Sequence, residues 1–205
     1  MQKGDTLIDL LRHGEVVGGH RLRGCRTDQP LSDKGWEQLR RATAHGDAWQ
    51  RVVCSPLRRC REFAEETSQR LGLPLRIEEG LRELDFGAWD GLPMERIWAE
   101  HADAARAFLD NPLSLTPPDG EPITEFRERV LTSWHGLLAE HTGEHLLLVA
   151  HGAVNRLILG HILCMPLQAL FRLEVDFACL SRVRAVEDGT RVVFHGGQVS
   201  IPKKR

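Results

Sequence analysis

Two histidines, each followed by glycine, stand directly after apolar runs of the sequence. His13 comes after the run 7–11 and Arg12, and His151 comes after the run 146–150. The carboxyl ends of parallel strands share one edge of an open sheet, and ligands bind at that edge. We therefore expect the two imidazoles to meet, although they are far apart in the chain. Paired imidazoles beside arginine are suited to chemistry on phosphate groups.

A third position is expected at the same edge of the sheet. Ser55 and Pro56 predict the start of a helix, because serine caps free amide groups and proline suits the first turn. Arg58 then lies just inside this helix. A phosphate at helix N-termini would meet backbone donors and guanidinium groups together, and Gly14 and Gly152 would let it approach the backbone closely.

Strand-like and helix-like patterns alternate along the chain. Ser32 predicts the cap of a helix, and a second helix is expected to end near Gly72. Segments 177–186 and 191–194 flank a turn-rich segment, which indicates a hairpin. Apolar residues at helical spacing predict helices that cover a sheet, over 32–43, 57–71, 94–108, 126–141 and 154–162.

These patterns predict an α/β fold. We expect a three-layer α/β/α sandwich around a mostly parallel central sheet, with an antiparallel strand near one edge. With 205 residues and 41% hydrophobic content, the chain is expected to form a single domain over 1–205. The proline-rich loop 111–122 is expected to be a surface lid, and it and the loop 16–28 are expected to determine specificity.

Composition disfavours several classes of function. The formal net charge of −2 gives no general attraction for nucleic acid or anionic lipid, so neither a nucleic acid nor a membrane is expected as a partner. The sequence shows no signal-peptide pattern and no apolar run of membrane-spanning length. Five cysteines without close pairing indicate a reducing, cytoplasmic location. We expect no metal and no cofactor, since the histidines lack metal-ligand spacing.

At this point the sequence resembles the histidine phosphatase superfamily, which contains phosphoglycerate mutases and many small phosphatases. The resemblance covers nearly the whole chain and rests on motifs in a fixed order. These motifs are Leu11-Arg12-His13-Gly14-Glu15, Pro30-Leu31-Ser32, Ser55-Pro56-Leu57-Arg58-Arg59-Cys60, Leu81-Arg82-Glu83-Leu84-Asp85-Phe86-Gly87, Pro118-Asp119-Gly120-Glu121 and Val149-Ala150-His151-Gly152.

The resemblance implies a mechanism with named roles. His13 would attack phosphorus to form a phosphohistidine, which water then hydrolyses. Glu83 would protonate the leaving group and afterwards deprotonate the water, with Asp85 as the competing candidate. A protonated His151 would stabilise the phosphoryl oxygens. The implied phosphate- and substrate-binding set is Arg12, Arg58, His151, Gly152 and Gly24.

Each of these residues also has a purely structural interpretation. A histidine after a strand is often a hydrogen-bonding core residue, and an arginine in the first turn of a helix is often a surface cation. Glu83 could equally be a surface loop carboxylate. It is the joint occurrence of these residues that favours catalysis.

The resemblance favours hydrolysis of small phosphomonoesters over phosphoryl transfer. The chain is too short between Gly91 and Asp119 for the segment with which the family's mutases enclose a bisphosphate. The segments 24–31 and 84–91 are similar to α-ribazole phosphatases, which act on a nucleotide-like intermediate of cobalamin assembly. Mutase-type transfer and noncatalytic binding of a phosphorylated ligand are the alternatives. The sequence leaves the oligomeric state open.

Overall fold

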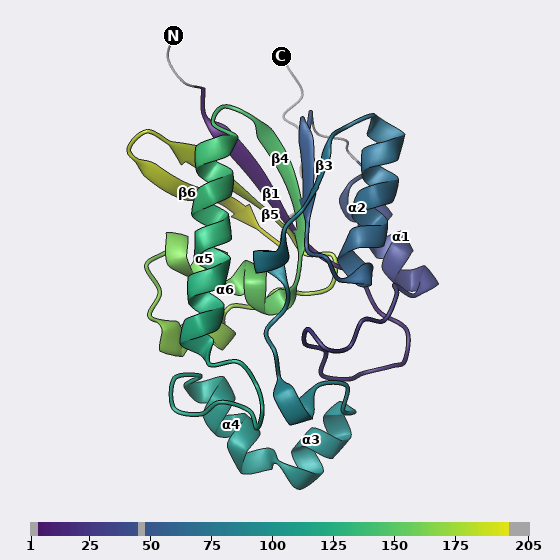
Figure 1. Ribbon diagram of the computed structural model, residues 1–205, viewed down its shortest axis with the longest axis vertical. Coiled ribbons are helices and arrows are strands. Elements are labelled where there is room, and N and C mark those ends of the chain that lie inside the picture. The colour runs from purple at the N-terminus through teal and green to yellow at the C-terminus, as the bar shows by residue number, and fades with distance from the viewer. Residues whose placement is uncertain (1–3, 45–47, 197–205) are drawn as a thin grey trace.

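A six-stranded sheet forms the centre of the molecule (Figure 1). The structure is a computed structural model that describes residues 4–44 and 48–196. The strands run in the order β3-β2-β4-β1-β5-β6. Four are parallel, namely β1 (Thr6–Arg12), β2 (Arg51–Cys54), β3 (Leu75–Ile77) and β4 (His145–Ala150). The antiparallel hairpin of β5 (Leu180–Val186) and β6 (Gly189–His195) completes one edge, so the predicted sheet is confirmed.

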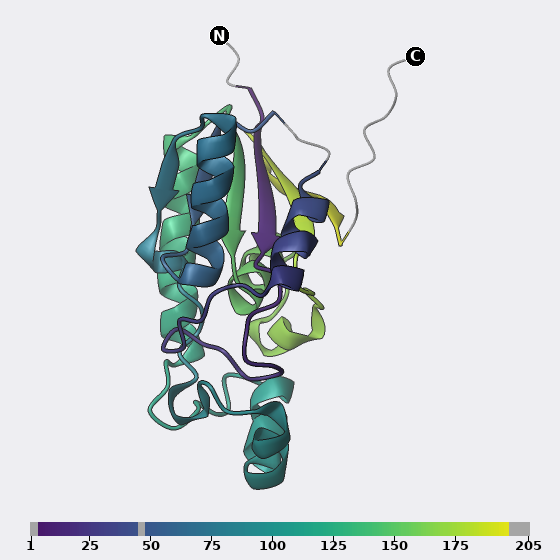
Figure 2. The ribbon, with the colours of Figure 1, turned by 90° about the vertical axis from the view of Figure 1, so that its right-hand side faces the viewer.

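Helices cover both faces of this sheet, as Figures 1 and 2 show. The helices α1 (Asp33–Ala42) and α2 (Arg58–Leu71) pack on one face, and α5 (Ile123–Glu140) and α6 (Gly152–Ile162) pack on the other. Strand β4 is buried on both sides, because Leu146 and Leu148 contact the α5/α6 layer while Leu147 and Val149 contact the α1/α2 layer. This arrangement confirms the predicted α/β/α sandwich.

Two predicted helix boundaries are correct. Ser32 caps α1 by accepting a hydrogen bond from the Gly35 amide at 3.1 Å. Gly72 ends α2 in the left-handed conformation, with φ of 66°. Glycine adopts this conformation at low cost because it has no Cβ.

The cap of α2 was predicted wrongly, although the helix begins within one residue of its predicted range. The helix begins at Arg58 after Leu57, and no side chain caps it. Ser55 instead has its hydroxyl 2.6 Å from Nε2 of His151, so its side chain takes part in a contact between β2 and β4. The phase of the helix agrees with its apolar spacing, because Cys60, Ala64 and Thr67 are buried.

The helix predicted over 94–108 is also different in the structure. His101 leaves the helical conformation, with φ of −134°, and divides the segment into α3 (Met94–Glu100) and α4 (Ala102–Asp110). Neither helix covers the sheet. Both lie beyond the carboxyl ends of the parallel strands (Figure 1), where Ile97 and Phe108 are buried in the hydrophobic cluster on the α5/α6 side.

No helix in the described ranges combines the length and the apolar character needed to cross a membrane.

A buried charge joins β1 to its neighbouring strands. Asp9 is fully buried and accepts hydrogen bonds from Arg182 at 2.7 and 2.8 Å and from the Trp49 indole at 2.8 Å; Nε2 of His145 lies 3.1 Å away. Burial opposes its ionisation, but the hydrogen bonds outweigh burial and lower the pKa of Asp9 below 3.8. Its stabilising effect is therefore complete above pH 3.8 and is lost as the pH falls further.

We expect Asp9→Asn to lower the free energy of unfolding by about 3–5 kcal/mol, because it removes the carboxylate that Arg182 binds in the interior. Asp5→Asn is the matched control, since Asp5 pairs with Arg184 at 3.9 Å and is 52% exposed. It should cost at most about 1 kcal/mol. Urea denaturation at pH 7 measures both, and equal losses would contradict the role of Asp9.

Candidate active site

The two histidines meet at the carboxyl ends of β1 and β4. Arg12 pairs with Ala150 in the parallel register, and the amide of His13 donates to the Ala150 carbonyl at 3.0 Å. The ring centroids of His13 and His151 are 5.4 Å apart, and the rings meet edge to face. The structure therefore brings together the two imidazoles whose meeting the strand pattern predicts.

The environment of His13 fixes its tautomer and its charge. Its Nδ1 donates a hydrogen bond to the Gly14 carbonyl at 2.8 Å, so Nδ1 carries the hydrogen and Nε2 carries the lone pair. Burial, and then the positive charges of Arg59 and Arg12, lower the pKa of His13 well below 6.5. The ring is thus neutral at pH 7, as a nucleophilic imidazole must be.

His151 is fully buried between two side chains of the neighbouring elements. Its Nε2 lies 2.6 Å from the Ser55 hydroxyl, and the Cys60 thiol packs 3.6 Å from both ring nitrogens. Burial, then Arg59 and His13, lower the pKa of His151 well below 6.5. The protonated His151 that the resemblance implies therefore requires a negative charge beside it, such as a phosphoryl group.

Arg59, rather than Arg58, is the α2 arginine whose charge acts on the two histidines. Arg58 is half-exposed, and its Nε donates to Glu62 one turn along α2 at 2.8 Å. Arg59 is fully buried and has the largest charge effect on both histidines. Consecutive helical residues point about 100° apart, so only one of the two arginines can face the sheet edge. The sequence contains Arg59 within a motif, but the motif alone did not indicate this orientation.

The buried arginines are held by backbone carbonyl oxygens rather than by carboxylates. Arg59 donates to Thr27 and Gly24 at 2.8 Å each, and Arg12 donates to Val175 at 2.6 Å. Burial lowers the pKa of Arg12 to about 10, which leaves it charged at neutral pH. In the part of the chain that the structure describes, the Nε atoms of both arginines are buried without a hydrogen-bond partner. Arg12 lines the cavity described below, whereas Arg59 is fully buried and is not among its lining residues.

Arg156 adds a further cation that sequence reasoning missed. It lies near the start of α6 and donates to the Leu173 carbonyl at 2.7 Å. A Cβ added to Gly152 would come within 3.0 Å of the Arg156 Nη1 and 3.4 Å of the Arg12 Nε. The signal in the sequence was its position, one helical turn after Gly152. Gly152 therefore lies between two guanidinium groups, and because it has no Cβ, a ligand bound by them can approach its backbone closely.

Gly24 has a structural position beside the site. Its amide donates to Asp90 at 3.1 Å, and its carbonyl accepts from Arg59. A Cβ here would come within 2.5 Å of the Leu84 carbonyl oxygen. The structure thus places Gly24 behind Arg59, and the cavity described below is not lined by it.

Glu83 lies at the N-terminus of α6. Its carboxylate is buried and accepts hydrogen bonds from the amides of Ala153 at 3.2 Å and Leu84 at 3.1 Å. Arg129 donates to the backbone carbonyls of Gly80, Arg82 and Glu83, which fixes the segment that carries the carboxylate. Asp85, the competing candidate, instead bonds Arg26 and the Gly87 amide.

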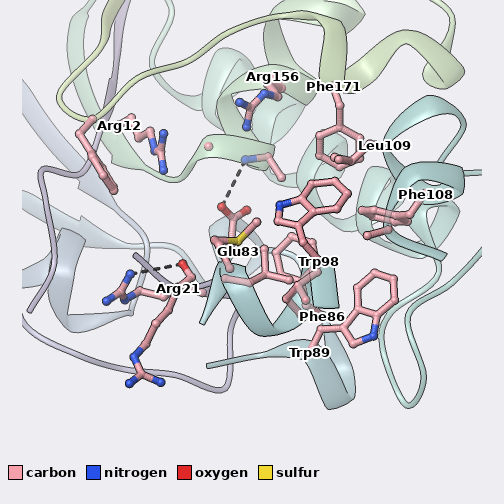
Figure 3. A pocket seen from close by; sticks show the side chains of 18 of the residues that line it. Arg12, Arg21, Glu83, Phe86, Trp89, Trp98, Phe108, Leu109, Arg156 and Phe171 are labelled. Atoms are coloured by element: carbon pink, nitrogen blue, oxygen red, sulfur yellow. Dashed lines mark hydrogen bonds between the residues drawn. The ribbon is translucent and has the colours of Figure 1, made fainter. Parts of the chain in front are cut away.

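A cavity of about 240 Å³ opens at this edge of the sheet (Figure 3). Arg12, His13, Glu83, Gly152 and Arg156 line one part of it, and aromatic and aliphatic side chains line the rest. Loop 16–28 supplies Arg21, Leu22 and Arg23, but the expected lid over 111–122 contributes no lining residue. The helices α3 and α4 form that wall instead.

Among the residues the structure describes, no cluster of three His, Cys, Asp or Glu could hold a metal ion.

The fold is that of an α/β protein with histidines and arginines at the carboxyl edge of its sheet, and comparison with known proteins gives its family. Residues 8–197 match the sequence model of the histidine phosphatase superfamily (branch 1). The chain belongs to this family.

Similar proteins span phosphatases and mutase-like proteins. The chain is 30% identical to the bifunctional protein Rv2228c of Mycobacterium tuberculosis over 92% of its length, but it spans only 52% of that protein, about half. It is 28% identical to the adenosylcobalamin/alpha-ribazole phosphatase of Escherichia coli, covering 85% of this chain and 87% of that one. It is 31% identical to the probable phosphoglycerate mutase GpmB of Citrobacter koseri, covering 86% and 83%.

Solved structures agree with these similarities. Bacillus stearothermophilus YhfR superposes with a TM-score of 0.87 at 26% identity, covering 95% of this chain and 98% of that one. A putative alpha-ribazole-5'-P phosphatase from Escherichia coli superposes with a TM-score of 0.82 at 26% identity, covering 94% and 97%.

We expect both active-site imidazoles to stay neutral as the pH falls through 6.5, because burial and Arg59 lower both pKa values. Long-range ¹H–¹⁵N NMR spectra, assigned with His13→Asn and His151→Asn, measure this and should show His13 as the Nδ1–H tautomer. Added vanadate should raise both pKa values by supplying negative charge. Protonation of either ring near 6.5 without an anion would contradict the account.

Proposed function

We propose that this chain hydrolyses small phosphomonoesters through a phosphohistidine on His13. The observation that carries the proposal is the tautomer of His13, whose Nδ1 donates to Gly14 and whose Nε2 therefore holds a lone pair. Beside this ring, the Nε atoms of Arg12 and Arg59 are buried without a hydrogen-bond partner in the described structure. Such donors match the oxygens of a phosphoryl group, over which charge spreads during transfer.

The first step forms a bond between Nε2 of His13 and phosphorus and breaks the bond from phosphorus to the ester oxygen. Arg12 and Arg59 bind the phosphoryl oxygens, so Arg59 takes the role that the resemblance implied for Arg58. Arg156 and the free amides at the start of α6 add further positive potential. His151 gains a proton only once the phosphoryl group is bound, because its buried ring is otherwise surrounded by cations.

Glu83 completes the reaction in this proposal. Its carboxyl group gives a proton to the departing alkoxide, then takes a proton from the water that attacks phosphohistidine. Its location supports this role, because Glu83 lines the cavity and is held at the start of α6 by two amides.

We further propose water, rather than a second phosphorylated metabolite, as the acceptor. The cavity wall formed by α3 and α4 is apolar, which disfavours a second anionic group. Mutase-type transfer is the alternative. Two relatives named as alpha-ribazole phosphatases support α-ribazole 5′-phosphate as a substrate to test. A cytoplasmic location is supported by the five unpaired cysteines.

The direct test is hydrolysis of p-nitrophenyl phosphate in the presence of EDTA. The wild type should turn over, and His13→Asn should lose at least about 10³-fold in kcat while keeping its fold by circular dichroism. Turnover that EDTA abolishes, or that His13→Asn retains, would contradict the proposal. A panel that includes α-ribazole 5′-phosphate and 3-phosphoglycerate, compared by kcat/KM, then tests the substrate.

Neighbouring arginines provide a matched pair of variants. We expect Arg59→Gln to lower kcat/KM by about 10²–10³-fold, because it removes a buried donor to the phosphoryl group. Arg58→Gln should stay within about threefold, because an exposed ion pair contributes little. Thermal unfolding shows whether Arg59→Gln remains folded, since Arg59 also binds the loop at Gly24 and Thr27. A larger loss for Arg58→Gln would overturn the assignment.

A further inference from the structure

The cavity has two parts of different chemistry. His13, Glu83, Arg12 and Arg156 form the phosphate end, and Arg21 and Arg23 lie at the rim. The remaining wall, which we call the apolar chamber, carries no charged side chain among the described lining residues. The apolar chamber is lined by Leu22, Phe86, Trp89, Met94, Ile97, Trp98, Ala105, Phe108, Leu109 and Phe171.

Aromatic contacts hold the inner wall of the apolar chamber in place. Phe108 on α4 packs against Phe86, Trp89 and Phe171, with ring centroids 6.1, 6.2 and 5.1 Å apart. Phe86, Trp89 and Phe108 are all nearly buried. Such packed rings have few alternative rotamers, so the apolar chamber is largely formed before a ligand binds.

The outer wall of the apolar chamber remains in contact with solvent. Trp98 on α3 is 40% exposed and Leu109 on α4 is 41% exposed, although both line the cavity. Figure 3 shows the Trp98 indole among the lining side chains, with Leu109 and Phe171 on one side of it and Glu83 on the other. A ligand ring placed against these side chains would remove apolar surface from water on both partners.

The arginines at the rim of the cavity are already engaged. Arg23 donates to the carbonyls of Val17, Gly19 and Arg21 and to the Gln29 side chain. Arg21 donates to the carbonyls of Gly18 and Gly91. These neutral partners hold both guanidinium groups at the rim without neutralising their charge, so a carboxylate that entered the apolar chamber itself would lose its water among uncharged side chains, which is costly.

Resting on the proposed function, we propose that the preferred substrates carry an uncharged, planar apolar ring on the leaving group. The ring binds in the apolar chamber while the phosphate binds at His13. Trp98 and Leu109 determine this specificity, because they supply the exposed apolar surface at its outer wall.

The test compares two esters whose leaving groups have similar basicity. We expect kcat/KM for 2-phenylethyl phosphate to exceed that for ethyl phosphate by about 10- to 100-fold, since one buried ring contributes a gain of that order in an apolar pocket. Calorimetry should show the same order of preference for 2-phenylethylphosphonate over ethylphosphonate, which bind without turnover.

Two leucines provide the matched control variants. Leu109→Ala should lower the phenylethyl-to-ethyl ratio by about fivefold. Leu113→Ala should leave it unchanged, because Leu113 is similarly exposed at 44% but does not line the cavity. Trp98→Ala should lower the ratio by about tenfold or more. Its exposed position makes loss of the fold from this change unexpected, and thermal unfolding checks that.

The outcomes separate this inference from the proposed function. If hydrolysis depends on His13 but the ratio is near one, or if Leu109→Ala and Leu113→Ala behave alike, the ring inference is wrong and the proposed function stands. If no ester is hydrolysed, the proposed function fails, and the phosphonate pair still decides the inference. Equal affinity for the two phosphonates overturns it.

Discussion

The parallel pairing of β1 with β4 is the constraint on which the site depends. Because Arg12 pairs with Ala150, the next residue of each strand is a histidine, and the two rings meet 5.4 Å apart. The pairing in turn depends on β4 being buried on both faces between two layers of helices. A register shift of one residue would turn the side chains to opposite faces and separate the imidazoles.

The electrostatics of the site follow from how its arginines are held. Carbonyl oxygens bind Arg12, Arg59 and Arg156, so their hydrogen bonds are satisfied in part while their charge is not neutralised. Glu83 is the single carboxylate among the described residues that line the cavity. Burial, together with the resulting positive potential, keeps both histidines neutral. The same potential prepares the site for an anion. A phosphoryl dianion would reverse this effect at His151, which couples binding of the substrate to protonation of the ring.

Much of this arrangement could be predicted from the sequence, because strand ends are visible as apolar runs that stop at polar residues. That logic located His13, His151 and Gly152. It failed at Arg58, because a strand-end pattern brings the first turn of α2 to the site but does not show which of two consecutive arginines faces the sheet edge. It also failed for 94–108, where the apolar spacing indicated burial but not the surface contacted. Arg156 was missed because an arginine in the second turn of a helix has no distinctive pattern.

The central claim is that His13 carries the phosphoryl group during turnover. Rapid quenching of the reaction with a ³²P-labelled phosphomonoester in alkali, followed by peptide mapping, measures this directly, because phosphohistidine is labile in acid. The account predicts a label on the peptide that contains His13, at a level that rises and falls with turnover, and no label in His13→Asn. Steady hydrolysis without a labelled histidine, or a label on another residue, would contradict it.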